Sequence, residues 1–122
     1  MVKALLISTD VWVSALIRRA QLAGASAVVA RKGDARAGAV LVKAYDTLNR
    51  TARLYTESVG LDGERLWIEP HPGAFEGELD AYAARQAHYD PDIWLVEIED
   101  REGRHFLVEE VDGDRPDPAT SA

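Results

Sequence analysis

The stretch YDPDIWLVEIEDREGRHFLVEE, residues 89–110, gathers side chains whose types and spacing could do chemistry. Asp90 and Asp92 open it. In an extended strand, Glu97 and Glu99 would point to the same side, with Cα atoms about 6.6 Å apart. Carboxylates in such clusters can hold Mg²⁺, and two carboxyl groups about 6.5 to 9.5 Å apart can perform inverting hydrolysis. One hypothesis is therefore a metal-dependent hydrolase that uses these four carboxylates.

A solvated β-hairpin explains the same stretch without catalysis, and we favour it. Pairing Ile98 with Phe106 would match apolar with apolar. The same register would set Glu99 opposite His105, which is a favourable cross-strand pair. The intervening three-residue loop would end at Gly103, and the last residue of such a loop adopts the left-handed conformation that glycine tolerates.

A second group of candidate residues is basic and lies in the first half of the chain. Residues 1–60 carry nine Lys/Arg and four Asp/Glu, a net +5, whereas residues 61–122 carry five and seventeen, a net −12. Within this half, a cluster could bind an acidic partner protein or a small anionic ligand through cationic side chains and backbone amides. Its members are Arg18, Arg19, Arg31, Lys32 and Arg36. The first two arginines also counter the negative end of a helix dipole, so a structural role competes with a binding role.

Other motifs argue against several enzyme classes. GDARAGAV has two glycines five positions apart, but Ala39 and Val40 stand where a phosphate-binding loop needs lysine and serine or threonine. The three histidines are scattered, and none forms the i,i+4 pair of a zinc protease. No Gly-x-Ser-x-Gly occurs. We therefore predict no cofactor and no metal on the favoured interpretation.

Composition indicates a globular protein of the cytoplasm. A chain of 122 residues is typical of one domain. It has no cysteine, which excludes disulfides and thiolate chemistry. The start of the chain has about five apolar residues before polar ones resume, fewer than the about 7 to 15 of a signal peptide. No run approaches the about 18 apolar residues of a membrane span. The net charge of −7 argues against a general nucleic-acid binder.

Hydrophobic periodicity predicts an α+β domain over residues 1–111, followed by a disordered acidic tail at 112–122. We expect a largely antiparallel sheet of five or six strands with two helices, in the order α-β-β-β-β-α-β-β. The first helix is apolar nearly all round, so it should pack on the sheet and offer a further face to a second subunit. The expected helices are 9–23 and 75–89, and the expected strands are 26–32, 37–45, 51–59, 65–71, 93–99 and 105–111.

The stretches WVSALIRRAQLAGASAVVARKGDARAGAVLVK (12–43) and YDPDIWLVEIEDREGRHFL (89–107) resemble a family of small bacterial proteins catalogued only as a domain of unknown function. The resemblance runs over about residues 9–111. It implies a small cytoplasmic bacterial protein with a compact α/β domain, and it implies no activity and no catalytic residue.

Taken together, these observations favour a non-enzymatic binding or interaction module, with a homodimer as one form that it could take. The partner would be a protein or a small anionic ligand, and neither a membrane nor a nucleic acid is expected. The alternative is the metal-dependent hydrolase. The two differ in whether the carboxylates of residues 90–99 converge in a concave site or point outward into water.

Overall fold

The computed structural model describes residues 7–112 and confirms the predicted order of elements. Of the predicted tail, only Asp112 is included, and the remainder lies outside the described residues. The elements are α2 (Thr9–Leu22), β1 (Ser26–Arg31), β2 (Val40–Asp46), β3 (Thr51–Val59), β4 (Arg65–Ile68), α3 (Glu76–Tyr89), β5 (Trp94–Asp100) and β6 (Glu110–Val111). No helix in this part of the chain is long and apolar enough to cross a membrane.

The six strands form one sheet in the order β1-β5-β2-β3-β4-β6. Three neighbouring pairs are antiparallel, but β2 with β5 and β4 with β6 are parallel. The sheet is therefore mixed rather than largely antiparallel. The reason is α3, which carries the chain across the sheet so that β5 returns parallel to β2, as a crossover connection allows and a tight turn does not.

The predicted hairpin of residues 93–111 is wrong. A strand has two edges, and both edges of β5 are occupied, one by β1 and the other by β2. The segment after Gly103 therefore cannot pair with β5, so it crosses the sheet as an irregular chain with a positive φ of 61° at Phe106. It ends in the short β6, which pairs with β4. The local part of the prediction is confirmed, because Gly103 has a left-handed φ of 68°.

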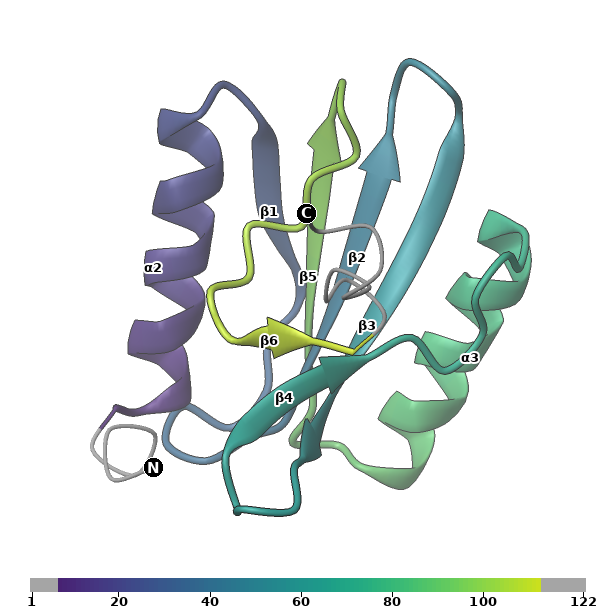
Figure 1. Cartoon of the computed structure of the whole chain (residues 1–122). Coiled ribbons are helices and arrows are strands. Elements are labelled where there is room, and N and C mark those ends of the chain that lie inside the picture. The colour runs from purple at the N-terminus through teal and green to yellow at the C-terminus, as the bar shows by residue number, and fades with distance from the viewer. Residues whose placement is uncertain (1–6, 113–122) are drawn as a thin grey trace.

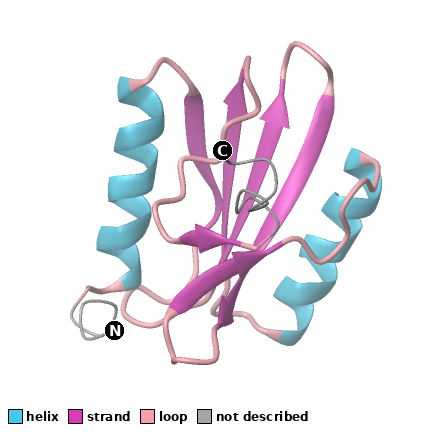
Figure 2. Ribbon diagram, viewed as in Figure 1, coloured by secondary structure: helices cyan, strands magenta, loops and turns pink. Residues whose placement is uncertain are grey.

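The two helices cover opposite faces of the sheet (Figures 1 and 2). Side chains alternate along β2, so Val40 and Val42 join the core beneath α2, whereas Leu41 packs with Leu79 beneath α3. The larger core lies on the α2 face, where the segment after β5 also packs. The first helix buries one side only: Leu16 is fully buried, while Leu22 remains 74% exposed.

Candidate functional site

A cavity of about 490 Å³ lies between α3 and the sheet, and we call it the α3 cavity. One side is apolar, formed by residues of α3, β2 and β5 with the loop before β5. The other side brings together charged groups from three separate elements. Its lining consists of Arg31, Leu41, Asp80, Ala83, Ala84, Ala87, His88, Ile93, Leu95 and Glu97.

A β-bulge places Arg31 in this cavity. Along β1, Val29 is opposite Val96 of β5, but Arg31 is opposite Leu95, so Ala30 is an extra residue in the ladder. Opposed residues share one face of a sheet, and one extra residue inverts the alternation of the side chains that follow. Arg31 therefore points to the α3 face with Leu95. Without the bulge, it would point to the α2 face.

The guanidinium of Arg31 is held in place but only partly satisfied. Its Nη2 donates a hydrogen bond of 3.2 Å to the carbonyl oxygen of Pro91. Its Nε is buried and has no hydrogen-bond partner among the described residues. A buried donor without an acceptor costs about 1 to 3 kcal/mol, so native proteins rarely leave one. Arg31 thus offers an oriented cationic donor at the edge of a cavity.

Glu97 supplies the opposite charge to the α3 cavity. It is half-buried on β5, and its carboxylate has no hydrogen bond or ion pair within residues 7–112. Lys43 stands beside it in the parallel register of β2. The ammonium of Lys43 is turned toward α3 instead, where it lies 2.7 Å from both Glu76 and Asp80. The nearest strand neighbour therefore leaves the charge of Glu97 unpaired.

The Lys43 ammonium is already ion-paired with Glu76 and Asp80 and has a structural role. Burial, the largest single effect, lowers the pKa of Lys43, but the hydrogen bonds and charges of Asp80 and Glu76 outweigh it and raise the pKa above its usual value. The lysine side chain is 9% exposed, so it depends on these two carboxylates for compensation. The ion pairs also fix the position of α3 over the sheet, and thus the width of the cavity.

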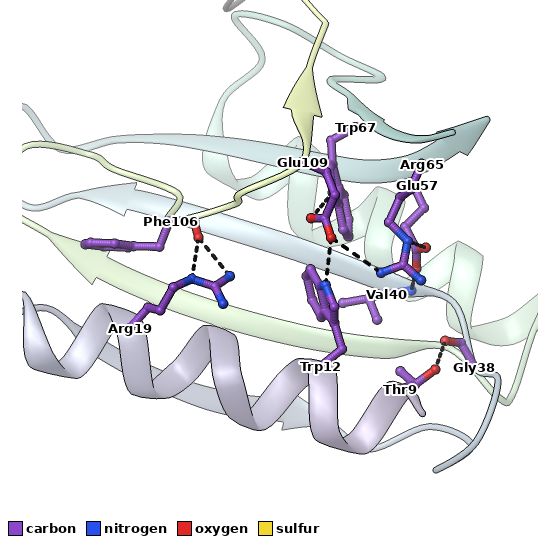
Figure 3. A network of polar contacts seen from close by, with 10 residues as sticks. All are labelled: Thr9, Trp12, Arg19, Gly38, Val40, Glu57, Arg65, Trp67, Phe106 and Glu109. Carbon is purple, nitrogen blue, oxygen red and sulfur yellow. Dashed lines mark hydrogen bonds and ion pairs between the residues drawn. The ribbon is translucent and has the colours of Figure 1, made fainter. Parts of the chain in front are cut away.

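A second polar arrangement lies on the α2 face (Figure 3). The rings of Trp12 and Trp67 stack with centroids 5.3 Å apart, and both indole N–H groups donate to the carboxylate of Glu109, at 3.0 and 3.2 Å. Arg65 lies over the Trp12 ring at 5.5 Å and 3.9 Å from the Glu109 carboxylate. Its Nε also lies 3.2 Å from a carboxylate oxygen of Glu57. This network joins α2, β3, β4 and the segment before β6.

Glu57 is the most deeply placed acid of this network. Its Oε1 accepts a 2.7 Å hydrogen bond from the backbone N–H of Val40. Burial raises the pKa of Glu57, and the charge of Arg65 and the bond from Val40 oppose that effect only in part. Beside the network runs a groove of about 650 Å³, which we call the α2 groove. It is lined by Ile7, Val11, Trp12, Ala15, Arg19, Gly63, Glu64, Arg65, Val108, Glu109 and Glu110.

The five basic residues singled out from the sequence do not form one site. Arg19 lies on the α2 face, where its Nε and Nη2 donate to the carbonyl oxygen of Phe106 at 3.2 and 3.0 Å (Figure 3). Arg31 lies on the opposite face, in the α3 cavity. Arg18, Lys32 and Arg36 are exposed. These residues are close in the sequence, but the fold does not bring them into one basic patch.

The four carboxylates of the hydrolase hypothesis are not assembled either. Asp90 accepts a 3.1 Å hydrogen bond from the backbone N–H of Asp92, which is a local turn contact. Glu99 is exposed. Within residues 7–112, no group of three or more His, Cys, Asp or Glu side chains is placed to hold a metal ion. The geometry gives the metal-dependent hydrolase no support, and Glu97 is the one member of the set that lines the α3 cavity.

The partners of Arg31 and Glu109 were not visible in the sequence. Arg31 reaches the cavity only because of the bulge at Ala30, and no local sequence pattern predicts that bulge. Trp12 and Glu109 are 97 positions apart, so their contact has no sequence signature. The available signal was weaker: two tryptophans whose polar N–H groups need an acceptor when they are buried.

Comparison with known proteins points to one family. A family model described as "Protein of unknown function (DUF1491)" matches residues 7–108. A crystal structure of a DUF1491 family protein from Caulobacter crescentus CB15 is 67% identical, with a TM-score of 0.85, and the match covers 87% of this chain and 99% of that one. An NMR structure of a DUF1491 family protein from the same organism is also 67% identical, with a TM-score of 0.82 over 87% of this chain and 96% of that one.

A more distant structure shares the fold. The solution structure of protein Atu0922 from A. tumefaciens is 30% identical, with a TM-score of 0.73, covering 90% of this chain and 97% of that one. No curated protein matches the chain. These bacterial relatives agree with the bacterial origin that the resemblance implied.

Proposed function

The chain belongs to the DUF1491 family, whose function is unknown, and from its geometry we propose that it is a non-enzymatic binding protein whose α3 cavity takes a small organic anion. The observation that supports this most directly is Arg31, whose side chain lines the cavity and whose buried Nε has no hydrogen-bond partner among the described residues. The cytoplasm remains the proposed compartment, and a chain without cysteine is compatible with it.

A carboxylate or phosphate oxygen would satisfy the orphaned donor. Charge-assisted hydrogen bonds from a guanidinium to such oxygens are short and about twice as strong as neutral ones. The bond from Nη2 to the carbonyl of Pro91 fixes the guanidinium before any ligand arrives, so little side-chain entropy is lost on binding. The cavity is therefore preorganised for an anionic group at the Arg31 end.

Glu97 and the apolar wall define the remainder of the ligand. The unpaired carboxylate of Glu97 would accept a hydrogen bond from an ammonium or hydroxyl group, and Ala83, Ala87 and Leu95 would contact a short hydrocarbon body. The described lining contains no serine, threonine or cysteine, which are common nucleophiles of covalent catalysis. Of its other reactive side chains, Asp80 is ion-paired with Lys43 and His88 packs edge-on against Tyr89. This composition favours binding over turnover.

Titration of the isotope-labelled full chain by NMR tests the proposal, with 4-aminobutanoate, butanoate and inorganic phosphate as probes. We expect saturable shifts at the Arg31 Nε–H and in β1, β5 and α3, and weaker binding at high salt where charge–charge attraction is screened. Arg31→Gln should abolish the shifts, whereas Arg36→Gln, an exposed arginine, should leave them unchanged.

A second pair of variants separates the two ends of the cavity. Glu97→Gln should weaken 4-aminobutanoate more than butanoate, because only the former carries an ammonium group. Glu99→Gln is the matched control, since it lies two residues further along the same face of β5 and is exposed. The proposal fails if none of the three probes binds saturably, or if Arg31→Gln binds them as wild type does.

A further inference from the structure

The outer side of α2 presents a mainly apolar stripe that residues 7–112 leave uncovered. Val11, Ala15, Arg18 and Leu22 follow one another at steps of four, three and four, so they lie along one line of the helix. All four are exposed, with Val11 at 57% and Leu22 at 74%. Opposite this line, Leu16 is fully buried in the core. We refer to the four residues as the α2 stripe.

The α2 groove extends the apolar surface beside the first half of the stripe. Val11 and Ala15 belong to both, and the groove adds Ile7 and Val108, which are 45% and 68% exposed. The turn between β3 and β4, which holds Glu64, lies at the same end of the molecule as the start of α2 (Figure 1). The surface is therefore mainly apolar, with Arg18 on the stripe and Glu64 at the edge of the groove.

Charges at the two ends of this surface are complementary. Glu64 has no side-chain hydrogen bond or ion pair among residues 7–112, and the same holds for the exposed Arg18. Glu109, by contrast, is already engaged with both indoles. One unpaired acid thus borders the first half of α2, and one unpaired base lies in its second half.

We propose that this surface binds a second copy of the chain, with the two α2 helices packed antiparallel about a two-fold axis. Placing Val11 opposite Leu22 of the second copy sets Arg18 opposite Ala15, a residue that lines the groove. The small Ala15 side chain leaves room for Arg18 to extend toward Glu64 of the other copy. Two-fold symmetry forms every such contact twice, so the stripe is complementary to itself.

Sedimentation equilibrium of the full chain at low and high salt tests the dimer. We expect a concentration-dependent dimer that Leu22→Glu converts to a monomer with an unchanged circular dichroism spectrum. Arg18→Glu and Glu64→Arg should each weaken the dimer by about tenfold, because two symmetric ion pairs are lost and like charges replace them. The double variant should restore most of the affinity.

Arg85→Glu is the control for these charge changes. It makes the same reversal at an exposed arginine of α3, on the opposite face of the sheet, and should leave the dimer unchanged. The proposal is overturned if the wild-type chain stays monomeric throughout. It is also overturned if the dimer survives Leu22→Glu at full strength, or if the double charge reversal restores nothing. Binding of the α3-cavity probes is measured separately, so either proposal can fail alone.

Discussion

Arg104 binds the carboxylate of Asp100 with two hydrogen bonds of 2.9 Å, from Nε to Oδ2 and from Nη2 to Oδ1. The backbone N–H groups of Glu102 and Arg104 donate to the same Oδ2, at 3.2 and 2.9 Å. The Asp100 side chain is almost fully buried. Four donors around one buried carboxylate fix the turn that ends β5 and send the chain across the α2 face.

Acid should destabilise this turn in a defined pH range. The hydrogen bond from the Arg104 side chain is the main cause that lowers the pKa of Asp100 from 3.8 to about 2, against the opposing effect of burial. Because the folded pKa lies below the unfolded one, the stabilisation is complete above about pH 4 and is lost as the pH falls toward 2. It amounts to about 2 kcal/mol.

Urea unfolding of wild type and Asp100→Asn at several pH values measures this contribution. At pH 7 the variant should be less stable by about 2 kcal/mol, and the difference should shrink as the pH approaches 2. Glu99→Gln, an exposed neighbour, is the control and should show no such dependence. A difference between wild type and Asp100→Asn that stays constant from pH 7 to pH 2.5 would contradict the assigned pKa.

A side chain at Gly103 should destabilise the fold for two reasons, backbone strain and crowding, and comparison with a second glycine separates them. Its φ is 68°, and a Cβ there would lie 3.1 Å from the Cβ of Asp46. Gly63 has a similar φ of 81°, but a Cβ there would meet nothing within 4 Å. Gly63→Ala should cost about 1 kcal/mol through strain alone, and Gly103→Ala more. Equal losses in thermal or urea unfolding would show that crowding by Asp46 is unimportant.

The same turn shows where prediction from the sequence stops. A glycine at the end of a short loop predicts a left-handed residue, because the backbone conformation of the loop is set locally. The φ of Gly103 confirms this prediction. Whether the next segment pairs with β5 is not decided by the local sequence. It depends on β1 and β2 having taken both edges of β5, and β1 begins at Ser26, far earlier in the chain. Periodicity therefore predicted the order of elements but not the pairing of the last one.

The candidate site was predictable to the same extent. Arg31 and Glu97 were recognised from the sequence as residues that could do chemistry, but each within the wrong group of neighbours. Runs of charged residues show which residues are close along the chain. A sheet instead brings together side chains from different strands that point to the same face. The bulge at Ala30 turns the Arg31 side chain to the other face of the sheet. This bulge arises in the pairing of β1 with β5, which the spacing of the charges does not encode.

Removing the two acids that bind Lys43 should cost more than removing the lysine. The Lys43 side chain is 9% exposed, whereas those of Glu76 and Asp80 are 47% and 53% exposed. Glu76→Gln with Asp80→Asn leaves a buried ammonium unpaired, at a cost of about 3 kcal/mol. Lys43→Met leaves two carboxylates that water can solvate, so the loss should be well below that. Urea unfolding at pH 7 compares the variants, and the reverse ranking would contradict this assignment.

Leu16→Ala should destabilise the monomer without changing how copies associate. Leu16 is fully buried on the inner side of α2, and truncation of such a leucine costs about 2 to 5 kcal/mol through lost transfer energy and a residual cavity. Leu61→Ala, at a fully exposed leucine, is the control and should change the free energy of unfolding by less than about 0.5 kcal/mol. Light scattering on the folded variants supplies the second measurement. A Leu16→Ala protein that keeps its unfolding free energy but loses its dimer would place Leu16 at the interface instead of in the core, and the exposed line of Val11 and Leu22 would then not be the contact surface.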